Sequence, residues 1–402
     1  MSQPQISSAR TSVVSGSGSF LFVLLVTAAN LRTPITSTGP ILENICQTFG
    51  LNSSQAGLLN FIPLLMFALL APVSASVGNR FGLEKTLWCA VWVITLGSVL
   101  RITGSEAGLW IGTVILSSGI AAANVLLPPL IKRDFTEHTA KYIGLYATTM
   151  AITASLASGV AVPLAGATRA GWFLSVGVWL IPAVVALIAW VPQLRKTRHQ
   201  RSATAGAACP TVLKSPWRSM LGWQVSLFMA LQSMAFYTLI AWFTPYAQAN
   251  GFSQVTAGWL LFVYQIVAVA SNFACMAALK KLPDQRMVGF VSSLAIFAGI
   301  TGLWLAPGLA ALWLVVAGLG AGASMVTCLS LFSLRAVDHR QASRLSGMGQ
   351  CVGYLVAAFG PLFFGILHEH SGGWTVPLVV LIAMSMLQMV VAPLAGRRRH
   401  IG

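Results

Sequence analysis

Long apolar stretches without charged residues recur along this chain. Examples are Phe20–Asn30, Leu87–Leu100, Leu109–Ile131 and Trp374–Leu394. Several approach the ~20 residues that an α-helix needs to cross the hydrocarbon core of a bilayer. Because they are apolar on most faces, helical periodicity adds little to their assignment. The pattern predicts an all-α integral membrane protein with twelve transmembrane helices. We expect them at 19–42, 55–77, 86–103, 108–131, 141–165, 171–191, 222–246, 254–279, 287–306, 309–334, 345–368 and 374–394.

The composition excludes a water-soluble domain of this length. Of 402 residues, 56% are hydrophobic and 8% are charged, whereas soluble domains average about 25% charged residues. The six cysteines are scattered without a CxxC pair, so the sequence favours neither a disulfide framework nor a zinc site. Residues 1–18 are polar and lack the features of a cleavable signal peptide, and we expect the first apolar stretch to act as an uncleaved signal-anchor.

The excess of basic residues sets the orientation in the membrane. The chain has 24 Lys and Arg against 8 Asp and Glu, a net charge of +16, which in a soluble protein would suggest nucleic acid as a partner. Here 21 of the 24 fall in segments on one side of the expected helices. By the positive-inside rule that side is cytoplasmic, with both termini, in a bacterial-type inner membrane. Arg32 lies within a helix, and Arg101 and Arg169 are expected in loops on the outer side.

The two halves of the chain resemble each other. Gly50–Phe61 aligns with Gly251–Phe262 at an offset of 201 residues, and Pro163-Leu164 aligns with Pro361-Leu362 at 198. At an offset of 203, the matched residues are Lys132, Lys141 and Gly144 with Arg335, Arg344 and Gly347. A parallel six-helix repeat is the architecture that rocks about a central site in alternating access.

The longest polar stretch divides these halves. We expect a cytoplasmic tail at 1–18, an N-terminal six-helix bundle at 19–191, a cytoplasmic linker at 192–221, a C-terminal six-helix bundle at 222–394 and a tail at 395–402.

The loop Ala75–Lys85 resembles the Gly-x-x-x-Asp-Arg-x-Gly-Arg-Arg signature of the major facilitator superfamily. Arg80, Gly82 and Lys85 match it, whereas Asn79 replaces the usual Asp and Ala75 the first Gly. The resemblance implies the major facilitator fold and a conformational latch at the three matching residues. Within the superfamily the chain is similar to the cyanate-transporter and 2-nitroimidazole-exporter branch (CynX/NimT), more so on the nitroimidazole side. The matching stretches are Asn30–Pro34, Gly39-Pro40, Asn124–Pro128, Leu130–Phe135 and Ser346–Tyr354.

Arg32 is the sharpest candidate for a functional residue. It lies about thirteen residues into its helix, where an unpaired charge costs a few kcal/mol or more. All eight acids fall in loops or at helix ends, so an anionic, nitro or carboxylate group on a solute would supply the counter-charge, with a bidentate fit. The alternative is an arginine that snorkels to the interface or caps carbonyls where Thr33-Pro34 breaks the helix.

Uncharged polar and aromatic residues at similar depth could complete a binding site. The candidates are Asn30, Asn124, Tyr146, Gln232, Tyr237, Tyr264, Gln265, Gln350 and Tyr354. Each could instead make a hydrogen bond between helices, which is the commoner role of a lone amide in a bundle. Trp242 and Phe243 precede Pro245 and are candidates for an aromatic gate or for an interfacial aromatic belt.

These features predict a secondary transporter of a small polar, anionic or heteroaromatic solute. A 2-nitroimidazole-type exporter is the first choice, uptake of cyanate or another small anion the second, and a receptor or scaffold without transport the alternative from another class. The sequence contains no HExxH and no GxxxxGK[ST], so we expect neither an enzyme, a primary pump, a metal nor a cofactor. The expected partners are the solute and the lipid bilayer, not nucleic acid. Protons are a candidate coupling ion, although no histidine or acid lies at mid-depth, and we expect a monomer.

Overall fold

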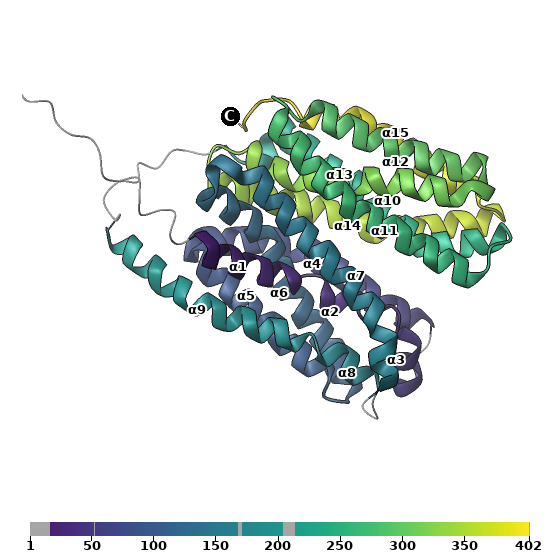
Figure 1. The fold of residues 1–402 in the computed structure, drawn as a ribbon, viewed down its shortest axis with the longest axis horizontal. Coiled ribbons are helices and arrows are strands. Elements are labelled where there is room, and N and C mark those ends of the chain that lie inside the picture. Colours follow the sequence, from purple (N-terminus) through teal and green to yellow (C-terminus); the bar gives the residue numbers. More distant parts are fainter. Residues whose placement is uncertain (1–16, 52, 168–170, 204–213, 402) are drawn as a thin grey trace, which may run out of the picture.

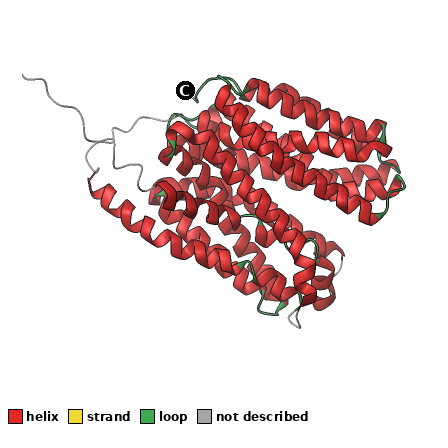
Figure 2. Ribbon diagram, in the orientation of Figure 1, coloured by secondary structure: helices red, strands yellow, loops and turns green. Residues whose placement is uncertain are grey.

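The computed structural model describes residues 17–51, 53–167, 171–203 and 214–401, and every regular element in these ranges is helical (Figure 2). Most of the predicted N-terminal tail, residues 204–213 of the predicted linker and Gly402 lie outside the described residues. Twelve of the described helical segments are long and apolar enough to cross a membrane. The prediction of a twelve-span all-α membrane protein is therefore confirmed.

The helices form an N-terminal bundle and a C-terminal bundle, drawn in purple to teal and in green to yellow in Figure 1. The N-terminal bundle contains α1 (Ser17–Ala29), α2 (Thr33–Thr36), α3 (Leu42–Phe49), α4 (Ser53–Phe81), α5 (Leu83–Arg101), α6 (Glu106–Asp134), α7 (Thr139–Ala167), α8 (Trp172–Gly177) and α9 (Leu180–Ala203). The C-terminal bundle contains α10 (Met220–Ala249), α11 (Gln254–Lys281), α12 (Arg286–Leu305), α13 (Ala310–Leu334), α14 (His339–Ser371) and α15 (Thr375–Ala395). Helix α9 continues to Ala203, into the segment that we expected to be a linker.

The first transmembrane segment is interrupted instead of running as one helix over 19–42. Helix α1 ends at Ala29 and α2 begins at Thr33. Pro34 has no backbone N–H, so it cannot donate to the carbonyl of Asn30 and continue the helical ladder. The turn between the two helices contains Arg32. The interruption thus places backbone carbonyls and a cation inside the membrane.

The two bundles meet at the end of the molecule that carries the C-terminus and diverge toward the opposite end (Figure 1). We call these the basic end and the far end, because basic residues gather at the helix ends where α4 meets α5, α6 meets α7, α11 meets α12 and α13 meets α14. One apolar core joins both bundles toward the basic end, where Leu127 and Ile131 of α6 cluster with Leu331 of α13. Toward the far end the core splits into one cluster per bundle, around Trp172 and around Phe243.

The internal repeat is visible in the packing between the bundles. Helix α4 packs on α14, and the repeat equivalents of these two helices, α11 and α7, also pack on each other. A glycine lies at each contact. A Cβ built on Gly347 would lie 2.8 Å from the Cβ of Ala75 and 3.0 Å from the carbonyl oxygen of Ala71, whereas the atoms nearest to one on Gly144 all belong to the side chain of Met276. The contact at Gly347 involves fixed backbone, and the contact at Gly144 involves a flexible side chain.

We therefore expect Gly347→Ala to lower the thermal unfolding midpoint of the purified protein more than Gly144→Ala. Overpacking against backbone typically costs about 1–3 kcal/mol, whereas Met276 can change rotamer. Both substitutions gain the same helix propensity, so the difference between them reports the contact. Equal midpoints for the two variants would contradict the assignment.

Candidate solute-binding site

A cavity of about 80 Å³ lies between the two bundles. It is lined from the N-terminal bundle by Arg32 and α7, and from the C-terminal bundle by α10, α11, α13 and α14. A buried water needs at least ~10–15 Å³ of such volume, so the cavity has room for one small solute. Of the predicted site residues, it brings together Arg32, Gln232, Tyr237, Gln265 and Tyr354.

Arg32 faces this cavity without a protein counter-charge among the described residues. Its Cζ lies 5.8 Å from the centre of the Phe236 ring, within the range of a cation–π contact. The phenols of Tyr237, Tyr354 and Tyr146 lie close enough to interact with it electrostatically. The described lining contains no Asp, Glu or His, and no ion pair with Arg32 is formed in the described part of the chain.

A second arginine supports the interruption from which Arg32 projects. Arg101 is 4% exposed, and its Nη1 donates to the carbonyl oxygen of Pro34 at 2.6 Å. The expectation that Arg101 lies in an outer loop is wrong, because it is the last residue of α5 and is buried within the N-terminal bundle. Gly112 leaves room for the arginine stem, since a Cβ there would lie 2.8 Å from Cγ of Arg101.

The wall contributed by α10 and α13 combines an amide with thioethers. The side-chain amide of Gln232 donates to Oγ of Ser233 at 2.9 Å and lies 3.5 Å from Sδ of both Met229 and Met325. Thioether sulfur is polarisable and makes favourable contacts with aromatic rings. Together with Phe236, these groups suit a flat, polarisable solute.

Two predicted residues lie beside the cavity and pack helices together. Asn30 is fully buried and donates to the carbonyl oxygens of Val26, at 2.7 Å, and of Pro182 in α9, at 3.1 Å. Tyr264 is 1% exposed, and its ring centre lies 6.0 Å from that of Phe236. Neither belongs to the lining.

Three further predicted residues form a hydrogen-bonded chain that also lies outside the lining. The hydroxyl of Tyr146 donates to Oδ1 of Asn124 at 3.0 Å. Nε2 of Gln350 donates to the backbone carbonyl oxygen of Asn124 at 2.9 Å and to Oγ of Ser346 at 3.0 Å. Asn124 belongs to the N-terminal bundle and Gln350 to the C-terminal bundle, so this chain joins the two.

The candidate gate residues lie toward the far end, within the C-terminal bundle. Nε1 of Trp242 donates to the carbonyl oxygen of Pro361 at 2.8 Å, and its ring packs near Trp374. Phe243 is 2% exposed in the core of that bundle. Neither residue lines the cavity.

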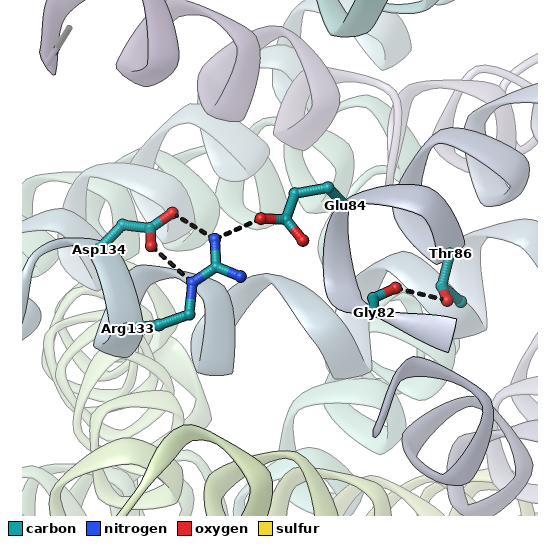
Figure 3. Close-up of polar contacts among 5 residues, drawn as sticks. All are labelled: Gly82, Glu84, Thr86, Arg133 and Asp134. Carbon is teal, nitrogen blue, oxygen red and sulfur yellow. Dashed lines mark hydrogen bonds and ion pairs between the residues drawn. The ribbon is translucent and has the colours of Figure 1, made fainter. Parts of the chain in front are cut away.

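At the basic end, Glu84, which lies between the signature-matching residues Gly82 and Lys85, belongs to an ion-paired cluster that the sequence did not indicate. Arg80 and Lys85 are exposed, and Gly82 adopts φ 99° ahead of α5. Arg133 of α6 pairs with Glu84 of α5 at 2.5 Å and with Asp134 at 2.6 Å (Figure 3). The available signal was the position of Glu84, an acid in the first turn of its helix, where the helix dipole favours a negative charge.

Hydrogen bonds across the bundles also gather at the basic end. Nζ of Lys132 donates to the carbonyl oxygens of Ser333, at 2.5 Å, and of Ala336. Its repeat equivalent, Arg335, donates within its own bundle, to the carbonyl oxygens of Ala395 at 3.0 Å and Gly396 at 2.9 Å. Burial lowers the pKa of Arg335 to about 10, so the guanidinium stays charged at neutral pH.

Comparison with known proteins gives consistent relatives. A family model described as Major Facilitator Superfamily matches residues 20–361. The uncharacterized transporter YycB of Bacillus subtilis (strain 168) is 40% identical over 94% of this chain and 93% of its own length. The 2-nitroimidazole transporter of Escherichia coli (strain K12) is 37% identical over 94% of this chain and 95% of its own length. The cyanate transport protein CynX of the same organism is 26% identical over 93% and 97%.

Solved structures resemble the fold along nearly the whole chain. The proton:xylose symporter XylE matches with a TM-score of 0.75 and 14% identity, over 92% of this chain and 94% of the other. FucP, a major facilitator transporter in the outward conformation, matches with a TM-score of 0.73 and 12% identity, over 94% and 98%. At these identities the likeness shows the fold alone.

We expect Arg101→Met to lower the thermal unfolding midpoint of the purified protein. The change leaves the carbonyl of Pro34 without its donor inside the membrane, which typically costs about 1–3 kcal/mol. Arg101→Lys retains a donor and should recover part of the loss. If Arg101→Met were as stable as the wild type, the arginine would not support the interrupted helix.

Proposed function

We propose that this chain, which belongs to the Major Facilitator Superfamily and to its branch of cyanate and 2-nitroimidazole transporters, moves a small anionic or nitro-bearing solute by alternating access through the cavity between its bundles. The observation that carries the proposal is Arg32. A cation turned into a membrane cavity, with no acid in the described lining, favours a solute that brings negative oxygens. A guanidinium binds two such oxygens in one plane.

Export of a 2-nitroimidazole-like heteroaromatic fits the remaining lining best. Phe236 and Tyr237 offer aromatic faces, and Met229 and Met325 offer thioethers. A flat ring gains from these contacts, whereas linear cyanate uses little more than the charge of Arg32. Uptake of cyanate or another small anion is the second candidate, supported by that charge and by the relative named for cyanate transport.

The proposed orientation puts the basic end in the cytoplasm of a bacterial-type inner membrane, following the positive-inside rule. The cross-bundle contacts at this end and the separate apolar clusters at the far end support a state closed to the cytoplasm. For an exporter this is the state that releases solute. In the proposed cycle a single chain suffices, since both bundles that rock belong to it.

Coupling to protons would take a particular form in this cavity. The described lining offers no carboxylate and no imidazole, the groups that titrate near physiological pH. A coupled proton would therefore travel with the solute or bind at a rim acid. Glu43, the rim acid favoured by the sequence, has a side chain outside the described residues.

Substitution of Arg32 tests the anchor directly. Arg32→Gln should weaken binding of 2-nitroimidazole to the purified protein about 10- to 100-fold, because a hydrogen bond to a charged group contributes about 1.5–3 kcal/mol. The affinity of Arg32→Lys should lie between those of the wild type and Arg32→Gln, since lysine retains the charge without the planar fork. Arg344→Gln is the matched control, because this exposed arginine of α14 lies outside the lining. Wild-type affinity in Arg32→Gln would refute the anchor role.

A flux comparison in proteoliposomes distinguishes the substrates. We expect 2-nitroimidazole to be transported faster than cyanate at equal concentration, and Met229→Ala to slow the heteroaromatic more than the small anion. The reverse order would favour the cyanate alternative. Absence of flux for a broad panel of small solutes would favour a receptor or scaffold over a transporter.

A further inference from the structure

Helix α6 exposes a backbone carbonyl because of its own sequence. Pro128 lies four residues after Asn124, at the position whose N–H would normally bond to the Asn124 carbonyl oxygen. Proline has no N–H and leaves that acceptor free. An unsatisfied carbonyl in the membrane interior costs several kcal/mol, so it requires a donor from elsewhere.

The donor comes from the other bundle. Nε2 of Gln350, a residue of α14 that is 1% exposed, lies 2.9 Å from this oxygen. Ser346 holds the same amide nitrogen at 3.0 Å from one turn earlier in α14. One turn later in α6, the carbonyl of Pro128 itself accepts from Oγ of Ser333 at 3.0 Å, again across the bundles. The proline segment of α6 is therefore a docking edge for α13 and α14.

This docking edge lies beside the cavity. Tyr146 donates to the side chain of the same Asn124, and it interacts electrostatically with both Arg32 and Tyr354 of the lining. The contact between Asn124 and Gln350 thus lies between the proposed binding site and the closed basic end.

We propose that Gln350 is a positioning residue that holds the bundles together through the carbonyl freed by Pro128. It touches backbone, not solute. When the basic end opens, α6 and α14 separate and this hydrogen bond breaks, so the bond stabilises the state that is closed at the basic end. The inference goes beyond the proposed function, because it concerns the conformational equilibrium of the protein without any solute.

The test measures distances between spin labels in the solute-free protein, with the native cysteines replaced. One pair, at Glu137 and Met287, reports the basic end, and a second pair, at Ala107 and Asn250, reports the far end; all four residues are exposed. In Gln350→Met, which keeps the shape and loses the donors, the population with a separated basic end should rise roughly fivefold. At 1.4 kcal/mol per tenfold, this corresponds to about 1 kcal/mol. The far-end pair should shorten in the same proportion of molecules.

Pro128→Ala restores an N–H that competes with Gln350 for the carbonyl of Asn124. It should therefore also raise the population with a separated basic end. Pro129→Ala is the matched control, because it removes the neighbouring proline and frees no competitor for that carbonyl. In the double variant Gln350→Met with Pro128→Ala, the shift should equal that of Gln350→Met alone. Unchanged distances in Gln350→Met, or fully additive shifts in the double variant, would overturn the proposal.

Should Gln350→Met fail to fold, Gln350→Asn, whose amide is one methylene too short, should give the same shift in the population with a separated basic end. A wrong substrate assignment would leave these distances unaffected, so the two proposals fail separately.

Discussion

The need to provide a donor for every backbone carbonyl inside the membrane organises this molecule. The hydrocarbon core contains no water that could donate to a free carbonyl. The chain nevertheless interrupts its helical hydrogen bonding repeatedly with proline. At three proline-containing places among the described residues, a side chain donates to a backbone carbonyl, and at Pro128 that carbonyl is the one that the missing N–H leaves free. Arg101 donates to the carbonyl of Pro34, Trp242 to that of Pro361, and Gln350 to that of Asn124. The first two contacts fix helices within a bundle, and the third joins the bundles.

The two halves share one fold but use equivalent positions differently. Lys132 and Arg335 correspond in the repeat, yet Lys132 donates across the bundles whereas Arg335 donates to carbonyls of its own bundle. The compact ammonium group of Lys132 suits the pair of carbonyl oxygens of Ser333 and Ala336 at the end of α13. The forked guanidinium can satisfy several acceptors at once, as the closely packed ends of α12 and α15 require. In the proposed cycle, the repeat thus supplies the two similar bundles, and individual side chains determine which contacts between them must break.

Much of this architecture could be predicted from the sequence, because it depends on properties that extend over many residues. Hydrophobic length gave the twelve spans, and the charge of Arg32 marked a residue that the structure places at the cavity. Whether an amide faces a cavity or a neighbouring helix depends on helix rotation, which a helix apolar on most faces does not reveal. This is why Gln232 and Gln265 line the cavity whereas Asn30 and Asn124 do not. The position of Arg101 was missed because its place at a helix end, three residues before Gly104, suggests a loop. The four-residue spacing of Asn124 and Pro128 was a usable signal, since it predicts a free carbonyl without any structure.

In the proposed cycle, alternation requires the two closed states to be similar in free energy. Several of the described bonds between the bundles join neutral groups, and each of these contributes only about 0.5–1.5 kcal/mol net. A set of such bonds can be broken without a large barrier, unlike buried ion pairs. Each described ion pair at the basic end instead lies within a single bundle, Arg133 with Glu84 in the N-terminal bundle and Arg286 with Asp284 in the C-terminal bundle. A solute bound to Arg32 of one bundle and to Gln232 or Gln265 of the other would replace the broken bonds while the bundles change from one closed state to the other. The pair of Arg133 with Glu84 thus stabilises the N-terminal bundle at its basic end, and in the proposed cycle the contacts that break are hydrogen bonds, including the charge-assisted ones from Lys132.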